Sequence, residues 1–162
     1  MKRIKIVFIG LISVLSFNSC SDNDSDTKTN SELIIGEWLY QSQTLNGNDL
    51  PFRDDCRGIN GIDFEVFRED NTFQVMDFDL NGGTECTFEE DESFSADWSI
   101  NEENATLSFQ MNDQIVDGTL VPGSAFTANI IELNETVLIY MITIDYDEDG
   151  TIDELTITLN KK

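Results

Sequence analysis

The 162-residue sequence contains no histidine and only nine lysine or arginine residues. Without histidine it cannot hold a Ser/His/Asp triad, a Cys/His pair or a histidine-ligated zinc or iron site. Its 32 aspartate and glutamate residues give a formal charge of −23, and such a chain repels polyanions, so we expect no nucleic-acid partner. The length fits one domain. The commonest catalytic sites are therefore excluded.

Recognisable catalytic motifs are missing as well. The chain has no Gly-x-Ser-x-Gly elbow, no phosphate-binding loop and no dinucleotide fingerprint. Paired carboxylates could in principle hydrolyse glycosides, but among 32 acidic residues some pair will always stand at a suitable spacing. We therefore expect that the protein is not an enzyme.

An export signal occupies the N-terminus. Three basic residues lie among the first five positions, and the apolar run that follows, residues 6–15, is too short to span a bilayer. Ser19 and Cys20 end this segment in a pattern that resembles the lipobox of bacterial lipoproteins. The resemblance implies a signal peptide over residues 1–19 and a cysteine that is lipidated at position 20. The alternative is an ordinary secretory signal followed by a free cysteine.

The segment after Cys20 is polar and acidic. Residues 21–24, Ser-Asp-Asn-Asp, resemble the signal that carries lipoproteins of the Bacteroidota to the outside of the outer membrane. No apolar residue follows until Leu33, so residues 20–32 are interpreted as a lipidated N-terminus and flexible tether. We predict a domain over residues 33–162 that acyl chains hold in the outer membrane. It faces the cell surface or, alternatively, the periplasm.

Two cysteines remain once Cys20 is assigned to lipid. An exported chain enters an oxidising compartment, and the even remainder, Cys56 and Cys86, favours a disulfide. Closing this loop would stabilise the fold by roughly 3.5 kcal/mol in the chain-entropy model. A reactive thiol is the weaker alternative, because no histidine can act as its base and the neighbouring carboxylates would suppress the thiolate.

From Leu33 onward the apolar residues recur with period two, and nothing indicates a long helix. For example, Ile62, Phe64 and Val66 alternate with Asp63 and Glu65, which predicts a strand with the apolar residues inside. Turn residues separate such runs. The fold class is therefore all-β, an antiparallel up-and-down barrel of eight or nine strands that closes to hide its edges. The predicted strands are 36–44, 61–68, 72–80, 94–100, 105–111, 114–121, 125–133, 136–147 and 151–160.

Several ordered motifs resemble the lipocalin-like lipoproteins of the Bacteroidota. They are Gly36-Glu37-Trp38 opening the first strand, Asp54-Asp55-Cys56 after it, and Trp98-Ser99-Ile100 in the second half. The resemblance covers roughly residues 33–162 and implies a lipocalin-like barrel that can enclose a cavity. It also implies structural roles for two residues: Trp38 fills the closed end, where its indole N–H needs a partner, and Gly36 permits close backbone approach.

The size of the inward residues decides between two functions. An eight-stranded barrel is just wide enough to be filled by side chains or to hold one small ligand. The first hypothesis is a surface-exposed, lipid-anchored binding protein for a small hydrophobic molecule; the alternative is a packed interaction or accessory module without such a ligand. The oligomeric state is not predicted. The residues expected to line a cavity are Tyr40, Phe64, Val66, Phe73, Val75, Phe109 and Met111.

One acidic loop has the residues of a calcium site. Carboxylates at positions 1, 3, 5 and 9 and a glycine at position 6 match the first part of a calcium loop. Strands are expected on both sides and position 12 is a threonine, so an EF-hand proper is excluded. The alternative is a simple hairpin turn in an acidic chain. The candidate ligands for Ca²⁺, the one cofactor considered, are Asp145, Asp147, Asp149, Thr151 through its carbonyl, and Asp153.

Overall fold

The computed structural model describes residues 28–52, 56, 62–80, 85–89, 94–116 and 119–162. Apart from one short helix, α1 (Asn30–Ile34), the regular structure in these residues is antiparallel β-sheet. None of the helical structure in this part of the chain has the length and hydropathy that a bilayer crossing requires. Cys20, the predicted signal peptide and most of the predicted tether lie outside the described residues.

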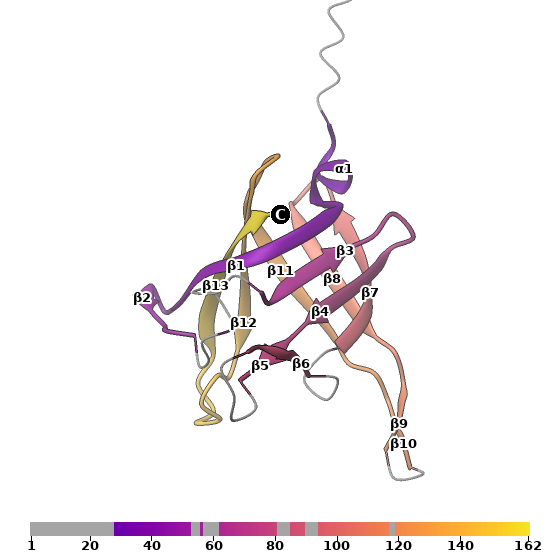
Figure 1. The fold of residues 1–162 in the computed structure, drawn as a ribbon, viewed down its shortest axis with the longest axis vertical. Helices are drawn as coiled ribbons and strands as arrows, with labels where there is room; N and C mark the ends of the chain where they lie inside the picture. The colour runs from indigo at the N-terminus through magenta and orange to yellow at the C-terminus, as the bar shows by residue number, and fades with distance from the viewer. Residues whose placement is uncertain (1–27, 53–55, 57–61, 81–84, 90–93, 117–118) are drawn as a thin grey trace, which may run out of the picture.

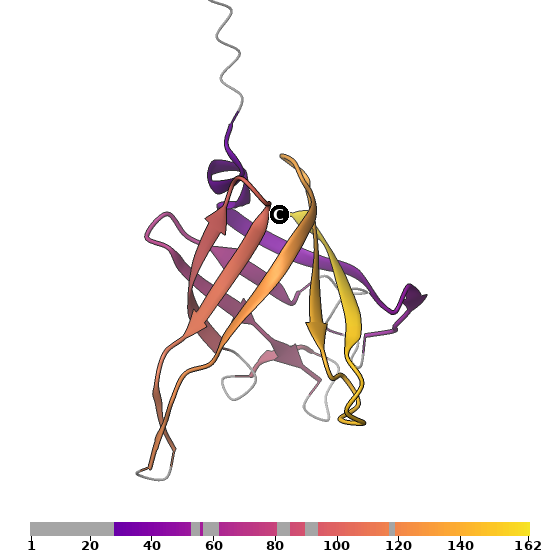
Figure 2. The same cartoon turned by 180° about the vertical axis from the view of Figure 1, so that it is seen from behind.

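Eight strands close into a barrel, as predicted (Figures 1 and 2). Neighbours along the barrel are neighbours in the chain, and the last strand pairs back onto the first through Trp38↔Lys161 to Leu45↔Leu155. Such closure leaves no long free edge. The strands, in barrel order, are β1 (Gly36–Leu45), β3 (Phe64–Phe67), β4 (Thr72–Met76), β7 (Phe94–Asn101), β8 (Thr106–Met111), β11 (Ala125–Leu133), β12 (Val137–Ile144) and β13 (Asp153–Lys161).

Short strands outside the barrel account for the remaining β-structure. β2 (Asn48–Asp49) pairs with the end of β1, β5 (Phe78–Asp79) pairs with β6 (Thr87–Phe88), and β9 (Gln114–Val116) pairs with β10 (Thr119–Val121). The expectation of one barrel strand over 114–121 was therefore wrong. That segment doubles back as a hairpin arm extending beyond the barrel (Figure 1), while β8 pairs directly with β11.

Helix α1 lies at one end of the barrel, called here the closed end (Figure 1). Thr29 and Glu32 form a capping box, in which the Thr29 side chain accepts from the Glu32 N–H and the Glu32 carboxylate accepts from the Thr29 N–H. Ile34 is fully buried, and its carbonyl accepts the indole N–H of Trp38 at 2.6 Å. The expected partner of this buried indole is thus the helix itself.

The helix is also tied to the barrel by its first turn. The carboxylate of Glu102 accepts from the backbone N–H groups of Asn30 and Ser31 and from the Ser31 hydroxyl. Lys28 forms an ion pair with Glu135 at 2.8 Å. Residues from 28 onward therefore already contact the domain, a few residues before its predicted start at residue 33.

The barrel interior is rich in large aromatic side chains. Phe67 contacts Phe73 at a centroid distance of 4.8 Å, Phe73 contacts Phe109 at 4.6 Å, and Phe109 stacks on Phe126 at 4.6 Å. All but Phe126 are at most 2% exposed. This half of the interior is a packed core, in which aromatic contacts add to the free energy of burial.

Strand β3 is turned the opposite way from the prediction. Asp63, Glu65 and Phe67 are buried, with exposures of 0%, 1% and 1%, whereas Phe64 and Val66 lie on the outer face. The pairing Trp38↔Glu65 puts Glu65 on the same side of the sheet as the buried Trp38. Burial of the carboxylates is tolerated because they accept hydrogen bonds, and Phe67 joins the core in exchange.

Candidate functional site

The end of the barrel opposite α1, called here the open end, carries the β5/β6 pair, the β9/β10 arm and the loop between β12 and β13 (Figures 1 and 2). The predicted disulfide is present: Cys56 joins Cys86, with an S–S distance of 2.03 Å. It fastens the segment before β3 to the segment before β6, and Cys56 is fully buried.

A cleft of about 490 Å³ lies between β11 and β12 near this end. Pairing of the two strands ends at Ala128↔Ile142, yet β11 extends back to Ala125 and β12 extends on to Ile144. Figure 2 shows the two strands diverging beyond that point. The lining alternates between inward and outward residues of both strands, so the cleft passes between the strands into the barrel wall. It is lined by Ala125, Phe126, Thr127, Ile142, Thr143 and Ile144.

The inward side of the cleft is apolar. Phe126, Ile142 and Ile144 are partly buried and pack against the barrel core. Behind Phe126 stands Phe109, stacked on it with an interplanar angle of 17°. A molecule that entered here would therefore meet aliphatic side chains on one side and aromatic rings on the other.

A polar cluster lies deeper in the barrel. The hydroxyl of Tyr40 on β1 donates to Oε1 of Glu65 on β3 at 2.8 Å, and the hydroxyl of Tyr140 on β12 donates to the same oxygen at 2.5 Å. Their exposures are 7%, 1% and 4%. Since β13 and β1 separate β12 from β3 in the sheet, the Tyr140 side chain reaches Glu65 across the interior. We call these three residues the Tyr-Glu-Tyr cluster.

Strand β12 contributes residues both to the cleft and to the Tyr-Glu-Tyr cluster. Inward-facing residues recur every second position on a strand, so Tyr140, Ile142 and Ile144 follow one another along the inner wall. Ile142 and Ile144 line the cleft, and Tyr140 is the next inward residue, about 7 Å further in. The lining of the cleft therefore ends at Ile142, one inward position before Tyr140.

The residues predicted to line a cavity divide into two groups. Tyr40, Phe73, Val75 and Phe109 are buried in the interior, and Met111 packs against the core near the open end. Phe64 and Val66 are corrected to the outer face, because β3 has the opposite parity.

Sequence reasoning missed Glu65, Tyr140, Phe126, Ile142 and Ile144. For β3, the usable sequence signal was that Glu65 and the buried Phe67 stand two positions apart and therefore share one face of the strand. The other four residues stood in strands whose inner face the sequence did not settle.

The two residues given structural roles both lie at the closed end. Trp38 is fully buried, and the ammonium of Lys161 stands 4.9 Å from its ring centre while donating to the carbonyl of Leu33. Gly36 has φ of +141°, and a Cβ added there would come 2.8 Å from the Lys161 side chain. Both the conformation and the approach favour glycine.

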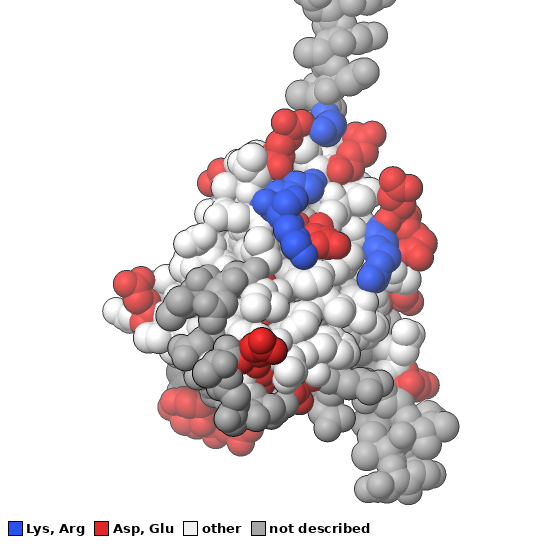
Figure 3. Space-filling view, in the orientation of Figure 1, with Lys and Arg blue, Asp and Glu red and all other residues white. Residues whose placement is uncertain are grey.

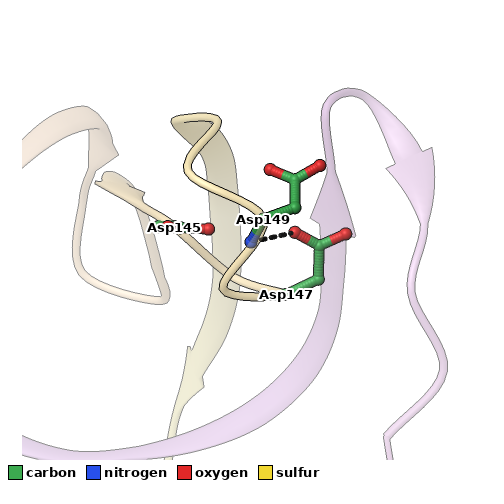
Figure 4. A group of neighbouring side chains, drawn as sticks. All are labelled: Asp145, Asp147 and Asp149. Carbon is green, nitrogen blue, oxygen red and sulfur yellow. Dashed lines mark hydrogen bonds between the residues drawn. The ribbon is translucent and has the colours of Figure 1, made fainter.

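The acidic loop between β12 and β13 brings three carboxylates together (Figure 4). Asp145, Asp147 and Asp149 each offer an oxygen, and these oxygens lie within 4.8 Å of one another on the exposed surface. The N–H of Asp149 donates to Asp147 at 3.3 Å, and the N–H of Gly150 donates to Asp145 at 3.0 Å. Hydrogen bonds from the side chain and the N–H of Thr151 lower the pKa of Asp149.

The other two predicted calcium ligands are placed differently. Asp153 accepts the Asn46 amide on one oxygen, at 2.6 Å, and the Tyr146 N–H on the other, at 3.2 Å. Its carboxylate holds the loop against the end of β1 and does not belong to the three-aspartate group. Thr151 donates its N–H to Asp149 at 2.7 Å. Of the five predicted ligands, the structure therefore brings together the three carboxylates of Asp145, Asp147 and Asp149.

A family model described as a lipocalin-like domain matches residues 34–140. No curated protein matches the sequence significantly.

Solved structures show more distant likeness. The bovine lipocalin allergen Bos d 2 is 15% identical, covering 82% of this chain and 75% of its own, with a TM-score of 0.43. A bovine odorant-binding protein in complex with a selenium-containing odorant is 14% identical, covering 83% and 74%, with a TM-score of 0.42.

Proposed function

This chain belongs to the family of lipocalin-like domains, and from that premise we propose that it binds a small hydrophobic molecule at the open end of its barrel. The observation that carries the proposal is the cleft between β11 and β12. Its volume, about 490 Å³, falls in the range of about 300–1,000 Å³ typical of small-molecule sites. Apolar walls with a few convergent polar groups beyond them are the usual composition of such sites.

The role is binding and not catalysis. Members of lipocalin-like families act through a barrel that holds a ligand, and fold alone does not specify which ligand. In the proposed role the aromatic wall supplies apolar contact area, and burial of the ligand gives about 25 cal/mol for each Å² of apolar surface removed from water.

Native mass spectrometry of protein purified from its own host tests the proposal. We expect a retained small molecule in the wild-type protein. Ala125→Trp fills the mouth of the cleft from an exposed position, so this variant should lose the molecule. Ile131→Trp is the matched control, because Ile131 is on the same strand and is 59% exposed outside the cleft. An empty wild-type protein, or retention by Ala125→Trp, would contradict the proposal.

A second candidate function is the packed interaction module. Phe64, Phe78 and Phe88 form an aromatic group outside the barrel, with centroid distances of 6.3 and 5.6 Å, and Phe88 is 44% exposed. Figure 3 shows that the face over β3 and β4 carries few charged side chains. Exposed aromatic groups of this kind are common at protein interfaces. A binding partner lost with Phe88→Asp and kept with Ile152→Asp would favour this function.

The lipid anchor and the site of action are part of the same proposal. We propose that Cys20 is lipidated, that the protein is a lipoprotein of the Bacteroidota type, and that it faces outward from the outer membrane. Support comes from the N-terminal pattern of basic, apolar and small residues before Cys20 and the acidic residues after it.

Calcium binding by the β12–β13 loop is also proposed. The support is the group of three carboxylates, whose mutual repulsion a hard cation would relieve. We expect a higher Tm in millimolar calcium than in excess chelator. Asp147→Asn should abolish that difference while keeping an oxygen to accept the Asp149 N–H, and Glu148→Gln, in the same loop, should keep it. An unchanged wild-type Tm would show that the loop is only a turn.

A further inference from the structure

Resting on the proposed function, we infer that the ligand of the cleft carries an amide with a free N–H, and that this amide completes the backbone pairing that stops between β11 and β12. The apolar part of the ligand lies against the inward side of the cleft. The inference assigns an amide-bearing ligand class to the site. It names two receiving groups of the backbone, the N–H of Thr127 and the C=O of Thr143.

The backbone of β11 shows which of its residues face the cleft. The N–H of Met111 donates to the C=O of Ser124, and the N–H of Ile130 donates to the C=O of Ala105. The even-numbered residues of β11 and its flanks therefore direct their backbone groups toward β8. Successive residues of a strand in an antiparallel sheet direct these groups to opposite neighbours, so Thr127 directs its own toward β12.

The pairing of β11 with β12 stops one step before Thr127. The last pair is Ala128↔Ile142, and the next residues along the two strands, Thr127 and Thr143, are not paired. The bond that this next step would add runs from the Thr127 N–H to the Thr143 C=O. Both residues line the cleft, and both are exposed. One backbone donor and one backbone acceptor thus stand on opposite walls of the cleft, outside the ladder.

An amide is the group that matches this donor and acceptor together. Its C=O accepts from the Thr127 N–H, while its own N–H, one bond away, donates to the Thr143 C=O. An ester or a carboxylate brings acceptors alone and leaves the Thr143 carbonyl without a donor. A site that hydrogen-bonds its ligand in this way discriminates against analogues that lack the donor, because its own polar group is then left unpaired.

The short length of the unpaired stretch favours a small molecule over a peptide strand. Beyond the last pair, β11 extends only over residues 125–127 and β12 only over residues 143–144. A peptide that joins a sheet edge pairs along an extended segment, whereas these two strand ends offer room for one amide. Phe126, Ile142 and Ile144 pack inward beside the same stretch, so they contact the apolar part of the molecule that carries the amide.

Isothermal titration calorimetry with three probes on one acyl chain tests the ligand class. The probes are N-methyloctanamide, N,N-dimethyloctanamide and methyl octanoate. The dimethylamide keeps the polar carbonyl but has no N–H, and the ester is nearly isosteric with the first probe and also has none. We expect the wild-type protein to bind N-methyloctanamide at least about fivefold more tightly than either of the others, the difference expected for one hydrogen bond.

Hydrogen exchange of single backbone amides, followed by NMR of the intact protein, tests the receiving group. The Thr127 N–H should exchange rapidly without ligand and at least about tenfold more slowly with saturating N-methyloctanamide, because a hydrogen bond protects an amide from exchange. The matched control is the Asn129 N–H, which belongs to the ladder through Asn129↔Met141. Its rate reports only the general stabilisation by the ligand, so it should slow by a much smaller factor.

Two variants at one position separate the backbone from the side chain. Thr127→Pro removes the N–H at a place where the ladder does not use it, and should weaken binding of N-methyloctanamide about fivefold. Thr127→Ala keeps the N–H and removes only the hydroxyl, so it should bind like the wild type. If Thr127→Pro does not fold, the exchange rate of Thr127 in the wild-type protein decides.

The outcomes distinguish this inference from the proposed function. If the three probes bind equally well, the cleft binds apolar molecules but the assigned ligand class is wrong. If N-methyloctanamide is preferred while Thr127 and Asn129 slow by the same factor, Thr127 does not receive the amide and the inference fails. If the wild-type protein binds none of the probes, the proposed function fails and the inference with it.

Discussion

Glu65 is the residue that most distinguishes this interior from a simple apolar core. A buried carboxylate costs several kcal/mol unless hydrogen bonds compensate for the lost water. Tyr40 and Tyr140 supply two such bonds from two other strands. Because hydrogen bonds to charged groups are shorter and stronger than neutral ones, three strands are held together at a point where an aliphatic side chain would only pack.

Removal of one of these hydroxyls should destabilise the protein. Tyr140→Phe deletes a buried donor to Glu65 and should lower the free energy of unfolding by about 1–3 kcal/mol, the usual cost of leaving a buried acceptor less well satisfied. Urea denaturation followed by tryptophan fluorescence measures the change. Tyr146→Phe, the same substitution in the β12–β13 loop, should cost less than about 0.5 kcal/mol, and equal effects in the two variants would contradict the prediction.

Individual residues were predictable where one face of a strand was plainly apolar. Trp38, Tyr40, Phe73 and Phe109 are inside as expected. The predicted orientations of Phe64 and Glu65 were the reverse of the observed ones. Within β3 alone, the apolar phenylalanine is the residue expected to be buried. The tyrosines that compensate Glu65 come from residues 25 and 75 positions away in the chain, and a single strand carries no record of such partners.

At the scale of elements, the alternation of apolar and polar residues predicted where strands form better than it predicted which strands join the barrel. Most barrel strands lie where period two placed them, and β8 agrees within one residue. The segment 114–121 has strand-forming residues too, but it pairs with itself in the β9/β10 arm. Whether a strand joins a barrel depends on what its neighbours pair with, and here β8 and β11 pair with each other.

The disulfide joins the segment before β3 to the segment before β6. Its sequence separation of 30 residues predicts a loss of roughly 3.5 kcal/mol in the free energy of unfolding when the bond is removed. Urea denaturation of the Cys56→Ala/Cys86→Ala variant measures this loss. The matched comparison is wild-type protein with and without reductant, in which no side chain is deleted; a difference below about 1 kcal/mol there would contradict the chain-entropy estimate.

Docking of α1 should depend on pH through Glu102. Hydrogen bonds from the side chain and backbone of Ser31 and from Asn30 lower the pKa of Glu102 from its ordinary value of 4.5. A carboxyl with a lower pKa in the folded state stabilises that state above its unfolded pKa, and the contribution is lost as the pH falls through the folded value. The wild-type protein should therefore lose this part of its stability below about pH 4.

Melting temperatures between pH 7 and pH 3 isolate the effect. Glu102→Gln should lower the Tm at pH 7, and its gap to the wild type should narrow as the pH falls through the lowered pKa of Glu102. Glu103→Gln, the neighbouring exposed position, is the control and should run parallel to the wild type across the range. A constant gap between Glu102→Gln and the wild type would show that charge on Glu102 does not hold the helix.

As a whole molecule, the barrel has two unlike ends. The closed end is filled by Trp38 and covered by α1, whereas the open end carries the β5/β6 pair, the β9/β10 arm and the cleft. The sequence predicted the closed cylinder because eight or nine strands in a row must hide their edges. It could not predict the cleft, since the divergence of β11 and β12 follows from where their register ends.

Attachment to a membrane is tested on the full chain. Cys20→Ala should move the protein from the membrane fraction to the soluble fraction of the host cell, since acyl chains are the proposed anchor and the acidic domain is repelled by anionic lipid. Cys56→Ala/Cys86→Ala is the control, because it removes cysteines without touching the lipobox. Membrane retention of Cys20→Ala would contradict lipidation at this residue.

The position of α1 determines which end of the barrel would face the membrane if Cys20 is the anchor. The described part of the chain begins at Lys28, beside the closed end of the barrel. The eight residues from Cys20 to Lys28 span at most about 28 Å. The closed end would therefore stay near the lipid headgroups, and the open end would face the surrounding medium. The proposed hydrophobic ligand would then reach the cleft from solution and not directly from the membrane beneath the protein.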